Sequence, residues 1–266
     1  MPVITMIQAQ KRPGRYNLYL DGAFAFGISE STLIQFRLAK DQQLEDSQVH
    51  AIQVAEIDAT ANTTALNYLS HQPRTKKELQ TKLATEGFGP EVITPVLRRL
   101  TELGYLDDAA YAGMVVRDNL TLGDRGPTGV MAKLKAKGVD ANVIADALAE
   151  VSASQWQELG LRVAQKAAKQ NAKRAYKDQL QRIQLALCQK GFTGDQVPLI
   201  MADLALEPDV EAEQDQLLMA ATKQWRQKRR YEGYERRQRV KQALFRQGFE
   251  LDAIDAVITQ LEADSV

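Results

Sequence analysis

Two stretches rich in lysine and arginine carry most of the binding chemistry that this 266-residue sequence offers. Residues 161–192 contain eight Lys or Arg and one acid, and residues 221–246 contain ten Lys or Arg and two glutamates. In the second stretch the cations are interleaved with Trp225, Tyr231 and Tyr234. Because cations pair with phosphates and aromatic rings stack on bases, this mixture favours a polyanion such as single-stranded nucleic acid. It also suits an acidic groove on another protein.

The alternative interpretation is a passive, solvated helix face, which would usually carry an acid four residues from each cation. Acids are scarce in both stretches, although the whole chain is neutral, with 34 Lys and Arg against 34 Asp and Glu. Residues 203–215 hold six acids and no base, so charge is segregated along the chain. We therefore expect a partner-binding surface that draws on cations from several segments. The predicted contact residues are Arg117, Arg125, Lys133, Lys166, Lys169, Arg174, Arg226, Lys228, Arg229, Arg230, Arg236 and Arg237.

Residues that could catalyse a reaction do not form a recognisable set. The phosphate-binding, dinucleotide, nucleophile-elbow and zinc-protease motifs are absent from the sequence. His50 and His71 have no cysteine nearby, and the single cysteine, Cys188, has no histidine in its segment. Asp107 and Asp108 could bind Mg²⁺, but capping of a following helix is favoured. We therefore predict a protein that is not an enzyme and has no catalytic residue, metal, cofactor or small-molecule substrate.

The location expected for the protein is the cytoplasm. The opening residues show no apolar run behind a basic leader, and no run of about 18 apolar residues occurs, so neither a signal peptide nor a membrane span is expected. One cysteine cannot form an internal disulfide, which fits a reducing compartment.

A helix–glycine–helix pattern that occurs four times predicts the elements that position these cations. Its central glycines, Gly87, Gly138, Gly191 and Gly248, are 51, 53 and 57 residues apart. Apolar residues recur eight and four positions before each glycine, and one, six and thirteen positions after it. The two apolar positions before the glycine lie on one helical face, and the glycine can adopt the left-handed conformation that ends a helix. Each period leaves room for one more helix, expected over 61–71, 108–120, 155–170 and 212–228.

The first 28 residues instead alternate apolar and polar positions and predict a three-stranded antiparallel meander. Arg12-Pro13-Gly14 marks one turn, and Asp21-Gly22 marks a two-residue hairpin. A short helix near residues 31–36 should follow, and the sheet should pack on a helix over about 47–71. The predicted fold is thus mainly α, with tandem three-helix repeats and a small N-terminal β unit. The predicted domains are residues 1–45 for the β unit and 46–104, 105–152, 153–207 and 208–266 for three-helix modules 1 to 4.

The segment around Gly104-Tyr105-Leu106-Asp107-Asp108, with Tyr111-Ala112 and Arg117 after it, resembles the core of the bacterial RecX family. Arg125-Gly126-Pro127 and Lys133-Leu134 ahead of Gly138 continue the likeness. The opening β segment is similar to that of the longer Gram-positive members, so the resemblance covers nearly the whole chain.

The resemblance implies tandem three-helix repeats arranged in an elongated curved rod. It further implies a cytosolic, negative regulator of RecA recombinase in DNA repair and the SOS response. Such a protein binds the groove of the RecA–ssDNA filament and inhibits its ATPase, strand-exchange and co-protease activities. Two alternatives to this function are a stand-alone single-stranded DNA-binding repeat protein and a scaffold for some other protein.

Overall fold

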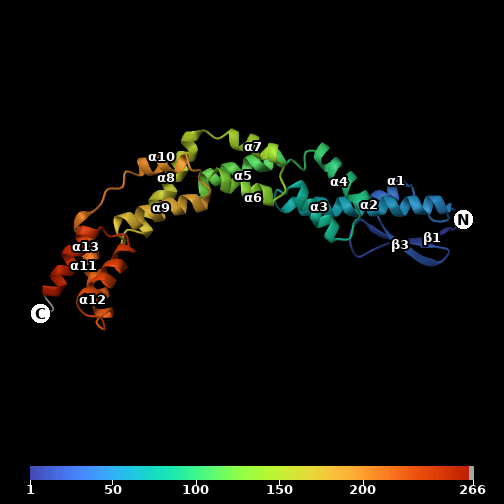
Figure 1. The fold of residues 1–266 in the computed structure, drawn as a ribbon. Coiled ribbons are helices and arrows are strands. Elements are labelled where there is room, and N and C mark those ends of the chain that lie inside the picture. Colours follow the sequence, from blue (N-terminus) through green and yellow to red (C-terminus); the bar gives the residue numbers. More distant parts are fainter. Residues whose placement is uncertain (264–266) are drawn as a thin grey trace. The chain divides into compact units, whose positions relative to one another are not determined.

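The computed structural model describes residues 1–263 and contains one three-stranded sheet and thirteen α-helices in that range (Figure 1). The strands and the first six helices are β1 (Ile4–Ala9), β2 (Arg15–Leu20), β3 (Ala23–Ser29), α1 (Glu30–Gln35), α2 (Asp46–His71), α3 (Lys76–Thr85), α4 (Pro90–Glu102), α5 (Asp108–Leu122) and α6 (Pro127–Ala136). The others are α7 (Ala141–Ala149), α8 (Ala153–Gln170), α9 (Tyr176–Lys190), α10 (Gln196–Leu204), α11 (Val210–Gln227), α12 (Gly233–Phe245) and α13 (Leu251–Ala263). The mainly helical class with a small N-terminal sheet is thereby confirmed.

The chain forms two compact units, and the division passes through the helices α5, α6 and α7. The N-terminal unit comprises residues 1–112 and 134–144, and the C-terminal unit comprises residues 113–133 and those from 145 onward. The boundaries predicted for the four modules stay a prediction, and the last three residues of the fourth lie outside the described residues.

The sheet has the order β1-β2-β3 with both pairs antiparallel, as the alternating pattern predicts. Asp21 and Gly22 both have positive φ, 50° and 84°, which is the geometry of a tight hairpin turn. The inner face of the sheet buries Leu18 against the core that also contains Ile52 of α2. A sheet of this size needs such a cover, and the expected packing against the helix over 47–71 is confirmed by contacts between β3 and α2.

Glu56 on α2 is a buried carboxylate that ties this helix to the sheet and to α1. It is only 7% exposed. Its Oε2 accepts hydrogen bonds from the Ser29 backbone N–H (2.6 Å) and from Thr32 Oγ1 (2.8 Å), and its Oε1 forms an ion pair with Arg15. Burial raises the pKa of Glu56, but the hydrogen bonds from Ser29, Thr32 and Arg15 together outweigh it, so the net pKa is lowered.

The four central glycines end their helices as the repeat predicts. Gly87, Gly138, Gly191 and Gly248 have φ of 91°, 77°, 87° and 94°. In each case the N–H of the next residue donates to the carbonyl of the leucine four positions before the glycine, for example Phe192 to Leu187 at 3.1 Å. These four leucines have no exposed surface. The apolar position thirteen residues after each glycine is less buried than expected, because only Leu100 of the four residues there is buried.

Three groups of three helices pack internally around these residues. Helices α2, α3 and α4 enclose a core that includes Leu79 and Leu83, and α11, α12 and α13 enclose one that includes Val240 and Leu244. Helices α8, α9 and α10 pack together in the C-terminal unit. Gly160 lets α8 pack closely against α10, because a Cβ there would lie 2.3 Å from the side chain of Ile200 on α10.

Successive second helices also meet end to end. In the N-terminal unit, Thr75 at the start of α3 donates its hydroxyl to the carbonyl of Lys137, just beyond the end of α6 (2.7 Å). In the C-terminal unit, the Thr128 N–H at the start of α6 donates to the Gly191 carbonyl at the end of α9 (3.1 Å). Each contact satisfies terminal groups that a helix leaves unpaired, and it brings a positive helix end to a negative one.

Replacing Glu56 by Gln should lower the free energy of unfolding at pH 7 by about 2–3 kcal/mol, because Arg15 loses its charged partner in a buried site. Since the pKa of Glu56 is lowered, its stabilisation is present above its ordinary pKa of 4.5 and is lost as the pH falls through the lower folded value. The difference between wild type and Glu56→Gln, measured by urea unfolding, should therefore shrink below pH 4.5. Glu102→Gln, at an exposed 3.9 Å ion pair with Arg98, is the control and should change little.

Gly191 and Gly87 form a matched pair for testing the helix-end contact. Both have φ near 90°, so alanine at either position is strained by about 1–2 kcal/mol. A Cβ on Gly191 would also lie 2.3 Å from the Gly129 nitrogen, whereas a Cβ on Gly87 would meet nothing within 4 Å. Urea unfolding should show Gly191→Ala to cost roughly 1–3 kcal/mol more than Gly87→Ala. Equal losses would show that the close contact is unimportant.

Candidate functional site

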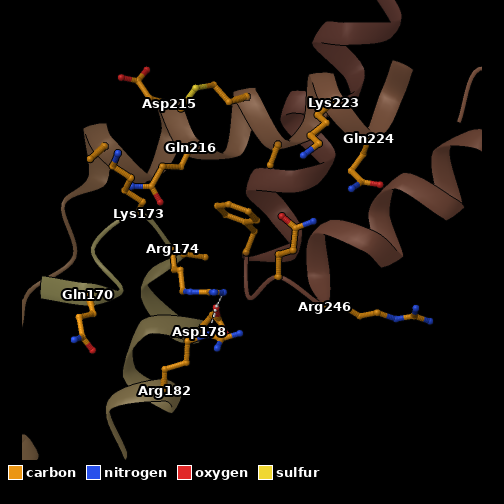
Figure 2. A pocket seen from close by; sticks show the side chains of 16 residues that line it. Gln170, Lys173, Arg174, Asp178, Arg182, Asp215, Gln216, Lys223, Gln224 and Arg246 are labelled. Carbon is orange, nitrogen blue, oxygen red and sulfur yellow. Dashed lines mark hydrogen bonds and ion pairs between the residues drawn. The ribbon is translucent and has the colours of Figure 1, made fainter. Parts of the chain in front are cut away.

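A cationic cleft of about 950 Å³ lies within the C-terminal unit, between α9 on one side and α11 on the other (Figure 2). Five cations line it, together with two acids, Asp178 and Asp215. The cations are Lys173, Arg174, Arg182, Lys223 and Arg246. Such an excess of one sign in a concave surface concentrates the positive potential there.

The α9 wall is held in place by one carboxylate. Asp178 Oδ2 accepts hydrogen bonds from Arg174 Nη1 just before α9 and from Arg182 Nε one helical turn further along, both at 2.9 Å (Figure 2). Burial raises the pKa of Asp178, but these two arginines together outweigh it and lower the net pKa, so the group stays ionised near neutral pH. Gly248, at the end of α12, lies against the backbone of Asp178, since a Cβ there would be 2.9 Å from its nitrogen.

Across the cleft, Lys223 and Gln224 project from α11 (Figure 2). Phe249, 5% exposed, adds an apolar element to the lining. Within the described residues, Lys173, Lys223 and Arg246 have no ion pair or side-chain hydrogen bond. These three cations are therefore available to a ligand, whereas Arg174 and Arg182 share the charge of Asp178.

The structure gathers several predicted contact residues around this cleft. Arg174 lines it directly. Lys166 and Lys169 are exposed on α8, one helical turn before Gln170 and the cleft residue Lys173. Arg226 borders a shallower hollow on α11 that shares Lys223 with the cleft. These cations therefore extend the positive surface from the cleft along α8 and α11.

Other predicted residues are engaged inside the α11–α13 group. The guanidinium of Arg236 lies 4.0 Å from the centre of the Trp225 ring, and its Nη2 donates to the Trp225 carbonyl at 2.7 Å. Arg237 forms ion pairs with Glu262 (3.0 Å) and Asp255 (3.7 Å). These contacts give both arginines a structural role, and partner binding by them stays a prediction.

The cations of the loop after α11 differ in whether their side chains contact other residues. Lys228 donates to Gln224 at 2.7 Å, and Arg230 lies over the Tyr231 ring at 4.9 Å. Arg229 is exposed and has no such contact within residues 1–263. Of these cations, Arg229 is therefore the one that a partner could bind without displacing an internal contact.

The remaining three predicted residues belong to α5, α6 and the loop between them. Arg117 on α5, Arg125 in the loop before α6 and Lys133 on α6 are all exposed. The backbone of Arg125 is fixed by Asn119, whose amide donates to its carbonyl (2.7 Å) and whose Oδ1 accepts from its N–H (3.2 Å). The Arg125 side chain is therefore presented from a well-defined loop, and a contact role for all three stays a prediction.

The twelve predicted residues omit four cations of the cleft. All four fall within the two basic stretches but are not among the twelve: Lys173, Arg182, Lys223 and Arg246. The spacing of Arg174, Asp178 and Arg182 is an available signal, because residues four apart share one helical face. For Arg246 the signal is its place two before Gly248, where the other repeats have Thr85, Ala136 and Gln189.

The described residues contain no group of three or more His, Cys, Asp or Glu arranged to hold a metal ion. Asp107 instead caps α5, its Oδ1 accepting from the N–H groups of Ala109 and Ala110 at 2.9 Å, as its position predicts. Asp108 accepts from the Lys76 N–H at the start of α3 (3.0 Å). No helix among the described residues is long and apolar enough to cross a membrane.

Comparison with known proteins assigns most of the chain to family models. The RecX N-terminal domain model matches residues 2–45, and the models of the first and second RecX three-helix domains match residues 61–100 and 107–148. The model of the third three-helix domain matches residues 211–258, which contain α12, all of α11 but its first residue, and most of α13. Helices α8–α10, which supply one side of the cleft, lie between the second and third matched domains.

The regulatory protein RecX of Lacticaseibacillus casei (strain BL23) is 44% identical over 261 residues, 98% of this chain and 99% of that protein. The RecX protein of Limosilactobacillus reuteri (strain DSM 20016) is 39% identical over 96% of this chain and 97% of its own length. A crystal structure of regulatory protein RecX, 36% identical, covers 76% of this chain and all of its own with a TM-score of 0.65. The crystal structure of RecX from Lactobacillus salivarius, 31% identical, covers 57% of this chain with a TM-score of 0.55. The chain therefore belongs to the regulatory protein RecX family, which consists of regulators rather than known enzymes.

Proposed function

We propose that this chain is a cytoplasmic negative regulator of RecA that binds the groove of the RecA–ssDNA filament and inhibits its ATPase, strand-exchange and co-protease activities. The observation that carries the proposal is the cationic cleft between α9 and α11, in a chain that belongs to a regulatory family. A nucleoprotein filament offers both phosphates and acidic protein groups to such a surface.

The charge arrangement suits recognition of an extended polyanion better than capture of a small anion. The cleft is open, and its unpaired cations Lys173, Lys223 and Arg246 come from three different segments of the chain. Lys166 and Lys169 on α8 and Arg226 on α11 add charge outside it. Contacts spread in this way can follow a polymer, whereas a compact ligand would need convergent donors in an enclosed site.

Inhibition would follow from binding across repeated units of the filament. The chain repeats a similar three-helix element, and RecA is itself a repeating assembly in this proposal. A protein bound to several adjacent subunits would oppose the rearrangements that each ATP cycle needs. Because its contacts are multivalent, loss of a single cation should weaken such binding only in part.

A second candidate function is single-stranded DNA binding without RecA. The interleaving of cations and aromatic side chains in residues 221–246 favours it. One of these aromatic side chains, Trp225, is 8% exposed and packs inside the α11–α13 group, so its ring serves the core and does not favour base stacking. The two functions differ in whether inhibition of RecA requires saturation of bare DNA.

The first test is ATP hydrolysis by RecA on single-stranded DNA with this protein added below one per RecA subunit. Wild type should inhibit steeply, and the double variant Lys223→Glu/Arg246→Glu should need about tenfold more protein, because two unpaired cations become repulsive. The double variant Arg37→Glu/Lys40→Glu, an equal charge change at two exposed residues of the N-terminal unit, should inhibit like wild type. Inhibition that appears only when bare DNA is saturated would instead support the second candidate.

Arg226 and Arg236 should respond differently to replacement by methionine, which keeps much of the side-chain length. Arg226→Met should weaken inhibition with unchanged thermal stability, since its charge is exposed and unpaired. Arg236→Met should lower the free energy of unfolding by about 1–2 kcal/mol, because methionine cannot replace the guanidinium over the Trp225 ring or its hydrogen bond to the Trp225 carbonyl. Thermal unfolding of both variants checks this, and a stable Arg236→Met variant with weak inhibition would assign Arg236 to the partner surface.

A further inference from the structure

The outer face of the N-terminal sheet carries a row of large side chains that lies on the opposite side from the core. Met6 pairs across the strands with Tyr19, and Tyr19 pairs with Phe24, so all three project from the same face. Leu18 and Ile28 point to the other face and are fully buried. Phe24 is 59% exposed and Met6 is 43% exposed. The exposed surfaces of Met6 and Phe24 therefore lie outside the core that the other face of the sheet forms.

The row is held in a fixed geometry. Tyr19 and Phe24 form an edge-to-face pair with ring centres 5.9 Å apart and planes at 75°. The Tyr19 hydroxyl donates to Gln8 Oε1 at 3.2 Å, which fixes that ring from its other end. Aromatic side chains that are already positioned lose little conformational entropy when a flat ligand stacks on them.

The next row on the same face offers hydrogen-bonding groups without bulk. It consists of Gln8, Asn17 and Gly27, which are paired across the three strands. Gln10 Nε2 donates to Asn17 Oδ1 at 2.6 Å, which leaves the Asn17 amide nitrogen and the Gln10 carbonyl oxygen for other partners. Gly27 contributes no side chain, and the Gln10 amide covers it, since a Cβ there would lie 3.1 Å from Gln10 Nε2. A planar ligand beside Phe24 would therefore meet amide groups. Amide groups of this kind can pair with the edges of nucleobases.

Positive charge follows at the turn between β1 and β2. Lys11 and Arg12 are exposed and have no ion pair within the described residues. Arg15 also lies near this face, with its Nη2 3.4 Å from the position of a Gly27 Cβ, but its charge is matched by Glu56. The face therefore presents aromatic rings and then amides, and the unpaired cations lie in the turn beyond β1, where Arg12 also lines a hollow shared with Thr60 of α2.

We propose that this outer face, here termed the sheet platform (Met6, Tyr19, Phe24, Gln8, Asn17 and the turn cations Lys11 and Arg12), binds single-stranded nucleic acid. Bases stack on Phe24 and Tyr19, and phosphates pair with Lys11 and Arg12. This occupant fits better than an apolar protein surface, because the aromatic row is bordered by polar amides and free cations rather than by further apolar side chains. The site is separate from the cationic cleft and does not rest on the proposed inhibition of RecA.

The test uses the full chain without RecA and a fluorescein-labelled thymidine 20-mer, with binding followed by anisotropy at several salt concentrations. Phe24→Ala should weaken binding about tenfold, as expected when one base can no longer stack, and should leave the salt dependence unchanged. Lys11→Gln/Arg12→Gln should instead make the logarithmic salt dependence shallower, by about 0.7 for each phosphate that the protein no longer neutralises. A 5-iodouracil oligonucleotide should crosslink on irradiation to residues in β1, β2 or β3.

Ile34→Ala is the matched control, because Ile34 is an apolar side chain of α1 that is 67% exposed and lies outside the platform. It should bind the 20-mer like wild type, and thermal unfolding should show that Phe24→Ala is folded. Unchanged affinity in Phe24→Ala, crosslinks only outside the strands, or no binding at low salt would each overturn the proposal. A lower sedimentation mass of Phe24→Ala would likewise overturn it and identify the face as a contact between copies. None of these outcomes depends on whether the chain inhibits RecA.

Discussion

The structure depends on one recurring constraint, the way in which the second helix of each repeat ends. A glycine with positive φ lets the next N–H reach back to a buried leucine carbonyl, so the chain reverses direction after the same turn each time. The same helix end then provides carbonyls for the start of another second helix, as Lys137 does for Thr75 and Gly191 does for Thr128. The contacts between successive second helices are thus made to backbone carbonyls, which every residue at the helix end carries.

The cationic cleft is a consequence of this arrangement. Gly248, just after α12, lies against the backbone of Asp178, and Asp178 in turn holds Arg182 of α9 and Arg174 just before that helix. Close contact between these two helices therefore sets the geometry of the charged wall. The α8–α10 group lies between the segments matched by the second and third domain models, so the cleft needs helices beyond the matched domains.

Charged side chains in both units are engaged in internal contacts. Glu56 forms an ion pair with Arg15 and ties α2 to the sheet, so both charges are used inside the N-terminal unit. In the α11–α13 group, Arg237 is held by Asp255 and Glu262, and Arg236 lies over Trp225. A high density of cations in sequence therefore does not mean a high density of free charge on the surface.

The sequence by itself determined the type and limits of most elements, because these follow from local chemistry. The hairpin at Asp21-Gly22, the cap at Asp107 and the four helix ends are each specified within a few residues. Only the tertiary structure decided which cations are free, since Arg237 meets acids 18 and 25 residues away and Arg246 joins a cleft lined by α9 and α11. Charge pairing depends on distances in space, and a periodic pattern fixes which face a residue occupies but not what lies opposite it.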